Sequence, residues 1–217
     1  MKLGKFIVLE GLDGSGKTTQ VKRLVEHLSK AKHHCLTTKE PTDGSIGMLA
    51  QETIRGISSL SSDTLALLFA ADRSEHILRK IRPALEAGIN VICDRFVYSN
   101  LAYQGDVIPQ KTIFAYNSQF LLSPDLTIFI DTSPEECTRR IISTRKNFEL
   151  FDGVQRAKGI QVEYFKAFAA YGKQMPVKII DGNLNEDEVF KQLINSVEEL
   201  LMQEVFDSTY SQMHMNT

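Results

Sequence analysis

One glycine-rich segment restricts the fold of this chain more than any other feature. The segment reads Gly-Leu-Asp-Gly-Ser-Gly-Lys-Thr, from Gly11 to Thr18, and lies between a short apolar run, Phe6 to Leu9, and a stretch with helical spacing that includes Val21 and Leu24. It satisfies the pattern G-x-x-x-x-G-K-[ST] with both of the flanks that the pattern needs, a strand before it and a helix after it. The chain is therefore predicted to contain a strand–loop–helix unit of the kind found in α/β folds.

This segment has the chemistry of a phosphate-binding loop. Glycines let successive backbone N–H groups turn toward phosphate oxygens, and the N-terminus of the helix adds partial positive charge. Lys17 is expected to bridge the β and γ oxygens of a nucleoside triphosphate, and Thr18 to offer its hydroxyl to Mg²⁺. A strand-to-helix turn that binds nothing is the alternative, and the complete motif makes it the weaker one. The predicted nucleotide-binding residues are Gly11, Leu12, Asp13, Gly14, Ser15, Gly16, Lys17, Thr18 and Thr19.

Short runs rich in Val and Ile recur along the chain and are typical of buried parallel strands. These runs are Phe6 to Leu9, Val91 to Cys93, Leu126 to Ile130 and Val177 to Ile180. Longer stretches with helical spacing separate them, and Ser133-Pro134-Glu135-Glu136 marks a helix start with an N-cap serine, a proline at the first helical position and a capping-box glutamate. Alternating strands and helices predict an α/β fold, in three layers, with a parallel five-stranded sheet flanked by helices.

The chain is predicted to form one domain, residues 1–206. A last amphipathic helix is marked by apolar positions from Val189 to Leu201, and residues 207–217 have little to bury, so this tail is expected to fray. Residues 139–159 alternate between polar, basic and acidic character, which makes them the best candidate for a mobile segment.

Composition excludes several classes of partner. The net charge of −2 gives no bulk attraction to nucleic acid or to an anionic membrane. The three cysteines, Cys35, Cys93 and Cys137, form no C-x-x-C pair, which suits a reducing compartment. No apolar run approaches the roughly 18 residues of a membrane helix, and no signal-peptide pattern is present. We expect a cytoplasmic location.

The phosphate loop alone indicates only a nucleoside triphosphate. A GTPase would need an N-K-x-D tetrapeptide, which the sequence lacks, and a motor or large ATPase would need a longer chain than 217 residues. A small nucleoside or nucleotide kinase is the leading interpretation. A nucleotide kinase needs a cation for the acceptor phosphate. Asp94-Arg95 follows an apolar run, at the carboxyl edge of the predicted sheet, where ligands of open α/β folds bind. A strand-end ion pair is the plainer alternative.

Several further blocks then carry a resemblance to one family. They are Glu10 to Gln20, Lys39-Glu40-Pro41, Leu68 to Arg73, Asp94-Arg95-Phe96, Ser99 to Gly105 and Pro124-Asp125-Leu126. In order and approximate spacing, this set resembles the thymidylate kinases, from Phe6 to about Asp181. The resemblance implies a P-loop nucleotide kinase that uses ATP and Mg²⁺ to convert thymidine 5′-monophosphate (dTMP) to dTDP, and it implies a homodimer.

The resemblance also implies roles for residues of the acceptor site. Phe69 would stack on thymine, Arg73 would reach the edge of the base, and the amide of Asn100 would both donate to the base and accept from it. Tyr103 would crowd the 2′ position of the sugar. Arg95 would hold the acceptor phosphate, and the rest of that pocket would be lined by Glu40, Ser99 and Gln104. For Phe69 a plain core position, and for Gln104 a surface turn, are the alternatives.

Catalysis in such an enzyme means alignment and positive charge, because a phosphate oxygen of the acceptor is already ionised near neutral pH. Asp13 is expected to position the acceptor or the hydrated metal, and Asp94 to hold metal-bound water. Some family members carry an arginine in the loop where this chain has Gly14, and others place basic residues in a lid over ATP. We expect the lid, about residues 139–159, to supply that charge here.

Within the lid we choose Arg145 as the transition-state cation, with Lys146 in reserve and Arg140 nearer the adenine. A solvated basic helix end is the alternative. The predicted catalytic residues are Asp13, Lys17, Arg95 and Arg145, and the predicted metal site is Thr18 with Asp94. Two other functions stay open: a deoxynucleoside kinase, which would need a carboxylate base beside a sugar hydroxyl, and a nucleotide-binding subunit without activity.

Overall fold

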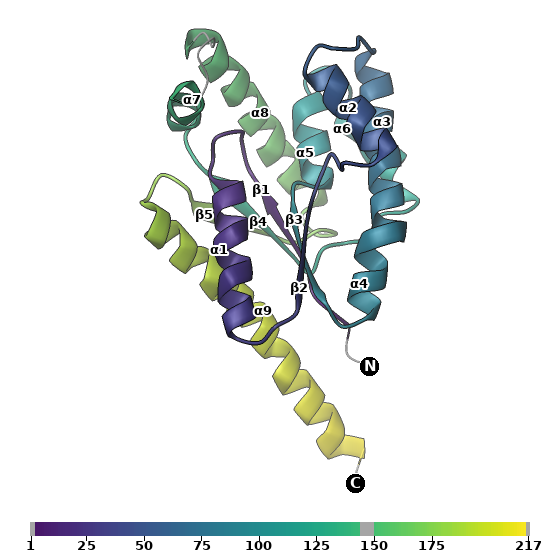
Figure 1. Ribbon diagram of the computed structural model, residues 1–217, viewed down its shortest axis with the longest axis vertical. Coiled ribbons are helices and arrows are strands. Elements are labelled where there is room, and N and C mark those ends of the chain that lie inside the picture. The colour runs from purple at the N-terminus through teal and green to yellow at the C-terminus, as the bar shows by residue number, and fades with distance from the viewer. Residues whose placement is uncertain (1–2, 144–149, 216–217) are drawn as a thin grey trace.

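The computed structural model describes residues 3–143 and 150–215, and its strands and helices alternate along the chain (Figure 1). The strands are β1 (Phe6–Glu10), β2 (Cys35–Lys39), β3 (Asn90–Asp94), β4 (Leu126–Asp131) and β5 (Val177–Asp181). The helices are α1 (Lys17–Lys30), α2 (Ser45–Ile54), α3 (Ser62–His76), the π-helix η1 (Ile77–Ile81), α4 (Arg82–Glu86), α5 (Val97–Gln104), α6 (Gln110–Ser118), α7 (Pro134–Ile142), α8 (Leu150–Tyr171) and α9 (Glu186–Met215).

All five strands are parallel and lie in the order β2-β3-β1-β4-β5, which confirms the predicted sheet. Parallel strands end at the same edge of a sheet, so the loops that follow β1 and β3 meet there. The register pairs Leu9 of β1 with Asp94 of β3. This pairing places the glycine-rich loop and the Asp94-Arg95 dipeptide side by side.

Each face of the sheet carries its own hydrophobic core, because successive side chains of a strand point to opposite faces. Phe6 and Val8 of β1 belong to the core that the helices α3, α5 and α8 complete. Ile7 and Leu9 point the other way and pack with apolar residues of α1 and α9. The three predicted layers, helices on both sides of one sheet, follow from this alternation.

Strand β2 is the one that the apolar runs did not reveal. It reads Cys-Leu-Thr-Thr-Lys and is buried only at Thr38. Its place at the edge of the sheet, where it pairs with β3 alone, permits the polar residues Thr37, Thr38 and Lys39 that interrupt the apolar pattern.

The start of α7 bears out part of its prediction. Ser133 caps the helix, since its hydroxyl accepts a 3.4 Å hydrogen bond from the backbone N–H of Glu136, and Pro134 opens it. The reciprocal half of the capping box is wrong. The Ser133 N–H donates instead to Asn183 Oδ1 at 2.9 Å, and the Glu136 carboxylate accepts from Arg139 and Arg140, both at 2.7 Å. A paired arginine is the stronger partner for this carboxylate.

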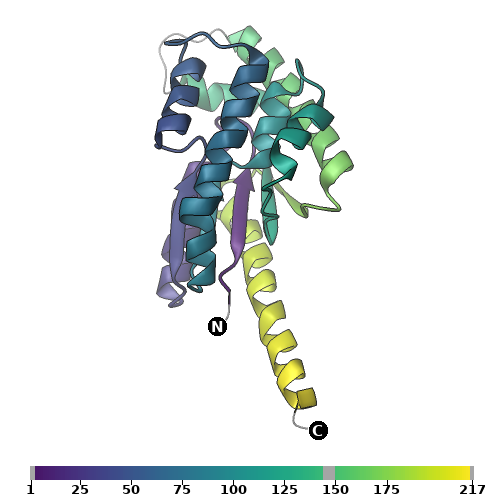
Figure 2. The ribbon, with the colours of Figure 1, turned by 90° about the vertical axis from the view of Figure 1, so that its right-hand side faces the viewer.

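Helix α9 crosses one face of the sheet and then projects away from the body of the domain (Figure 2). It continues through residues 207–215, and the fraying of this tail stays a prediction. Within the two described ranges, no helix combines the length and the apolar character needed to cross a bilayer.

Candidate functional site

The glycine-rich loop connects β1 to α1, and three of its glycines adopt the left-handed backbone that other residues rarely take. Their φ angles are 151° at Gly11, 82° at Gly14 and 96° at Gly16. Lys17 folds back over the loop, so that its Nζ donates to the carbonyl oxygens of Gly11 at 2.9 Å and Leu12 at 2.7 Å. Burial and the nearby Arg95 lower the pKa of Lys17 to about 8. The ammonium group is thus held beside the backbone N–H groups that face a phosphate in loops of this type.

Thr18 and Asp94 meet at the metal position that the sequence predicts. The Thr18 hydroxyl donates to Asp94 Oδ2 at 2.8 Å, while the other oxygen, Oδ1, is buried and lacks a hydrogen-bond partner within the described part of the chain. Mg²⁺ prefers oxygen ligands, takes only one or two from the protein, and completes its shell with phosphates and water. The pair therefore fits Mg²⁺. Among the described residues, no cluster of three or more His, Cys, Asp and Glu side chains offers a full protein cage.

Arg95 directly follows β3, at the edge of the sheet where the parallel strands end, and its side chain points at the glycine-rich loop. Its Nη2 contacts Asp13 Oδ1 at 2.6 Å and donates to the Tyr103 hydroxyl at 3.1 Å, and its Nη1 donates to Ser99 Oγ at 2.9 Å. The guanidinium carbon also lies 4.9 Å from the centre of the Tyr103 ring. Although burial opposes it, the charges of Arg95 and Lys17 lower the pKa of Asp13. Asp13 therefore stays ionised beside a fixed cation.

The backbone of Arg95 is strained, with φ at 73°, in a region that a non-glycine residue rarely occupies. The buried carboxylate of Glu10 holds the chain in this shape. It accepts from the backbone N–H of Phe96 at 2.8 Å and of Ser99 at 3.1 Å, from the Ser99 hydroxyl at 2.6 Å and from the Tyr164 hydroxyl at 2.9 Å. Burial raises the pKa of Glu10, and these donors act in the opposite direction.

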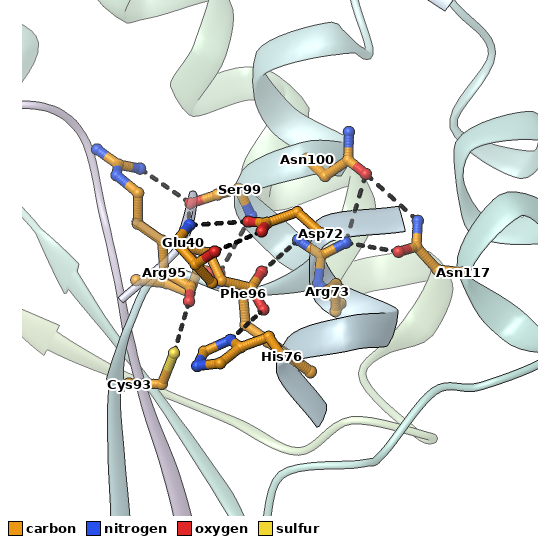
Figure 3. A network of polar contacts seen from close by, with 12 residues as sticks. Glu40, Asp72, Arg73, His76, Cys93, Arg95, Phe96, Ser99, Asn100 and Asn117 are labelled. Atoms are coloured by element: carbon orange, nitrogen blue, oxygen red, sulfur yellow. Dashed lines mark hydrogen bonds and ion pairs between the residues drawn. The ribbon is translucent and has the colours of Figure 1, made fainter. Parts of the chain in front are cut away.

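Arg73 of α3 lies in a second polar cluster, almost completely buried. Its Nη2 contacts Glu40 Oε2 at 2.7 Å, and its Nη1 donates to Asn117 Oδ1 and, at 3.5 Å, to Asn100 Oδ1 (Figure 3). Asn100 in turn donates from Nδ2 to Gln104 Oε1 at 3.0 Å. The predicted acceptor residues Glu40, Arg73, Asn100 and Gln104 thus form one connected group.

Two clefts open beside these clusters. One, of about 460 Å³, is bordered by Tyr103 and Gln104 of α5, by the start of α3 and by Arg156 of α8. The other, of about 870 Å³, begins at Thr18 and Asp94 and runs along β2 toward His76. Both clefts therefore reach residues that the sequence assigns to the site.

Comparison with known proteins places the chain in a family. Residues 9–193 match the profile of the family described as thymidylate kinase. The chain belongs to the thymidylate kinase family. A probable thymidylate kinase of Pyrococcus abyssi is 40% identical over 206 residues, which cover 92% of this chain and 98% of that protein. One of Thermococcus gammatolerans is 33% identical over 209 residues, 92% and 99% of the two chains, and one of Pyrococcus horikoshii is 47% identical over 144 residues, 64% and 70%.

The lid predicted from resemblance to thymidylate kinases is only partly within the described residues. Arg140 of α7 lies against the phosphate loop: its Nη1 donates to the carbonyl oxygens of Gly14 at 3.4 Å and Ser15 at 3.5 Å. Arg145 and Lys146 lie outside the described residues, and their roles stay predictions. A Cβ at Gly14 would lie 2.5 Å from the backbone oxygen of Cys137 in α7. The close approach of α7 leaves no room for a side chain in the loop there.

The structure gives the remaining predicted residues the following positions. Phe69 is half-buried on α3, one helical turn before Arg73, and is not among the described side chains of the two hydrophobic cores. Thr19 is exposed on the first turn of α1. Tyr103 lies over Arg95, and burial raises its pKa to about 12, so it is a neutral donor and acceptor.

Sequence reasoning assigned no role to Glu10, Tyr164, His76 or Asn117. Glu10 did carry a signal, because an acidic residue ends an otherwise apolar, buried strand. Tyr164, by contrast, is one aromatic among several on an amphipathic helix. His76 Nδ1 donates to Glu40 Oε1 at 3.0 Å, and His76 Nε2 is hydrogen-bonded to Thr38 Oγ1 at 2.7 Å; only the folded chain brings these groups together.

Proposed function

We propose that this chain transfers the γ-phosphoryl group of ATP to dTMP, giving dTDP and ADP, with Mg²⁺ bound beside Thr18 and Asp94. The observation that carries the proposal is the 2.6 Å contact between Asp13 and Arg95. It supports the proposal because a guanidinium, which can bind a phosphate, lies next to the loop that is expected to hold the phosphates of ATP. Membership of the thymidylate kinase family supports dTMP as the acceptor.

The proposed mechanism needs alignment rather than a general base, because the attacking oxygen of dTMP is ionised near neutral pH. Arg95 would hold the acceptor phosphate, and Asp13 would keep that guanidinium in position until the phosphate arrives. Lys17 would leave the carbonyl oxygens of the loop and follow the γ-phosphoryl group during transfer. When bound, Mg²⁺ supplies positive charge that neutralises the β and γ oxygens.

The acceptor base and sugar would lie in the region around the second polar cluster. Phe69 would stack on thymine, since its ring is half-buried and on the same side of α3 as Arg73. Tyr103 would stand against the 2′ position of the sugar, because its hydroxyl is already fixed by Arg95 and by the backbone N–H of Asp13. Glu40, Ser99 and Gln104 complete the pocket.

Three further features belong to this proposal. Residues 139–159 would act as a lid, with Arg140 near the adenine and Arg145, backed by Lys146, as the transition-state cation. The protein would work in the cytoplasm as a homodimer. Exposed apolar side chains on α2 and α3, Met48, Leu49 and Leu67, support a dimer. The molar mass by light scattering tests it.

The acceptor test compares dTMP with thymidine under the same Mg-ATP. We expect phosphorylation of dTMP and little phosphorylation of thymidine, and we expect Lys17→Ala to lose turnover. Turnover of thymidine alone would favour a deoxynucleoside kinase. A protein that turned over neither acceptor, yet bound ATP, would favour a nucleotide-binding subunit without activity.

A further inference from the structure

Asn117 lies at the C-terminal end of α6, is completely buried, and joins the two residues proposed to contact the base. Its Oδ1 accepts from Arg73 Nη1, and its Nδ2 donates to Asn100 Oδ1 at 3.3 Å and to the backbone oxygen of Ile113 at 2.7 Å. Figure 3 shows the amides of Asn117 and Asn100 and the Arg73 guanidinium facing one another. Asn117 has no place in the phosphate chemistry of the site.

The neighbours of Asn117 permit only one orientation of its amide. A guanidinium can only donate, so the amide oxygen must face Arg73. A backbone carbonyl can only accept, so the amide nitrogen must face Ile113. Rotation of the amide by 180° would place two donors together on one side and two acceptors on the other. The oxygen of the Asn117 amide is therefore fixed by a group that can only donate, and its nitrogen by a group that can only accept.

The orientation of the Asn117 amide also determines the orientation of two further amides, those of Asn100 and Gln104. Asn100 faces donors from Asn117 and from Arg73, so it must present its oxygen to them and its Nδ2 to the other side. Asn100 Nδ2 then requires the oxygen of Gln104, and the 3.0 Å bond between them meets this requirement. Gln104, which borders the 460 Å³ cleft, is left with its Nε2 and two N–H groups. The linked amides of Asn117, Asn100 and Gln104 therefore present N–H donors on the side where the base would bind.

We propose that Asn117 is a positioning residue that fixes this polarity, so that the pocket favours a pyrimidine with a carbonyl at position 4 over one with an amino group. The inference rests on the proposed function, because it takes Asn100 and Gln104 as neighbours of the base. It also revises the role expected for Asn100. Its oxygen already accepts from two groups, so the amide is set to donate to a base oxygen and not to accept from the ring N–H.

The first test is Asn117→Asp, which keeps the shape and the acceptor for Arg73 but removes both donated hydrogen bonds. Titration calorimetry with dTMP and dCMP measures the preference as a ratio of dissociation constants, with or without turnover. We expect the preference for dTMP to fall on the order of tenfold, the equivalent of one hydrogen bond, and KM for dTMP to rise while kcat changes little. A purely structural role would lower affinity for both monophosphates and leave their ratio unchanged.

Asn185→Asp is the matched control. Asn185 caps α9 by accepting from the backbone N–H groups of Asp187 at 3.1 Å and Glu188 at 3.0 Å, a task that an aspartate performs equally well. This variant should keep the wild-type ratio. If Asn117→Asp fails to fold by circular dichroism, Gln104→Glu, at a half-exposed position, takes its place and should lose the same preference, because a carboxylate offers no N–H.

The outcomes separate this inference from the proposed kinase activity. Selective binding of dTMP without phosphorylation would contradict the kinase and leave the role of Asn117 standing. Phosphorylation of dTMP with a dTMP-to-dCMP ratio unchanged within twofold in the folded variants would overturn the role of Asn117 alone. A wild-type protein that binds the two monophosphates equally would overturn it as well.

Discussion

The lowered pKa of Lys17 predicts that nucleotide binding takes up a proton at alkaline pH. In the free protein, burial and the charge of Arg95 hold the pKa of Lys17 at about 8, below its ordinary value of 10.5. A bound phosphate favours the charged ammonium and raises this pKa again. Lysine that is neutral in the free protein must therefore bind a proton when the nucleotide arrives.

The magnitude follows from the fraction of neutral lysine at each pH. Uptake should be almost zero at pH 6, about half a proton per site at pH 8 and about 0.9 at pH 9, for a pKa of about 8 that binding moves well upward. Calorimetric titration with ADP in buffers of different ionisation enthalpy measures it, because the slope of observed enthalpy against ionisation enthalpy is the number of protons exchanged.

Lys17→Arg is the control, since a guanidinium stays charged throughout this range. Its slope should be close to zero at pH 8 and pH 9, and the difference between the two proteins isolates Lys17 from other titrating groups. Equal slopes in the two proteins, or no slope in the wild type at pH 9, would show that burial does not lower the pKa of Lys17.

Three other predictions concern the residues around the loop. Tyr164→Phe removes a hydroxyl that donates to the buried carboxylate of Glu10, so chemical denaturation should show a loss of about 1.5–3 kcal/mol in the free energy of unfolding; a loss near zero would count against Glu10 as an anchor. Gly14→Ala adds a Cβ at a backbone φ of 82° and only 2.5 Å from a backbone oxygen. Gly56→Ala has a similar φ of 73° in open surroundings, so it costs only the roughly 1–2 kcal/mol of the left-handed backbone. Gly14→Ala should therefore lower Tm by more than Gly56→Ala. The reverse order would contradict the close approach of α7. Asp94→Asn should raise the Mg²⁺ concentration for half-maximal activity about 10–100-fold, and an unchanged Mg²⁺ titration would remove Asp94 from the metal site.

The fold could be predicted from the sequence where burial of an element produces a recognisable pattern of apolar residues. The central strands β1, β3 and β4 are covered on both faces, so their sequences are apolar runs. The glycines of the loop indicate the turn between β1 and α1. The edge strand β2 lacks that signal because three of its five residues, Thr37, Thr38 and Lys39, are polar, which partial burial permits. The capping box at Ser133 failed for another reason: two arginines compete for the carboxylate of Glu136.

For the candidate site, local motifs gave the phosphate loop and resemblance gave the acceptor residues. What neither could supply is the set of contacts between distant segments. Tyr164 reaches Glu10 across 154 positions of the chain, and Asn117 reaches Arg73 across 44. Each is an ordinary residue in its own helix, and only the packing of α6 against α3 and of α8 against α5 and β4 gives it a polar partner.

The acceptor itself is tested most directly by a panel of nucleoside monophosphates assayed with ATP and Mg²⁺. We expect the highest kcat/KM for dTMP, with dTDP and ADP formed in equal amounts. The value for dUMP should be lower by roughly 10–200-fold, since one methyl group in a pocket is worth about 1–3 kcal/mol. A higher kcat/KM for any other monophosphate, or no turnover of dTMP, would contradict dTMP as the acceptor.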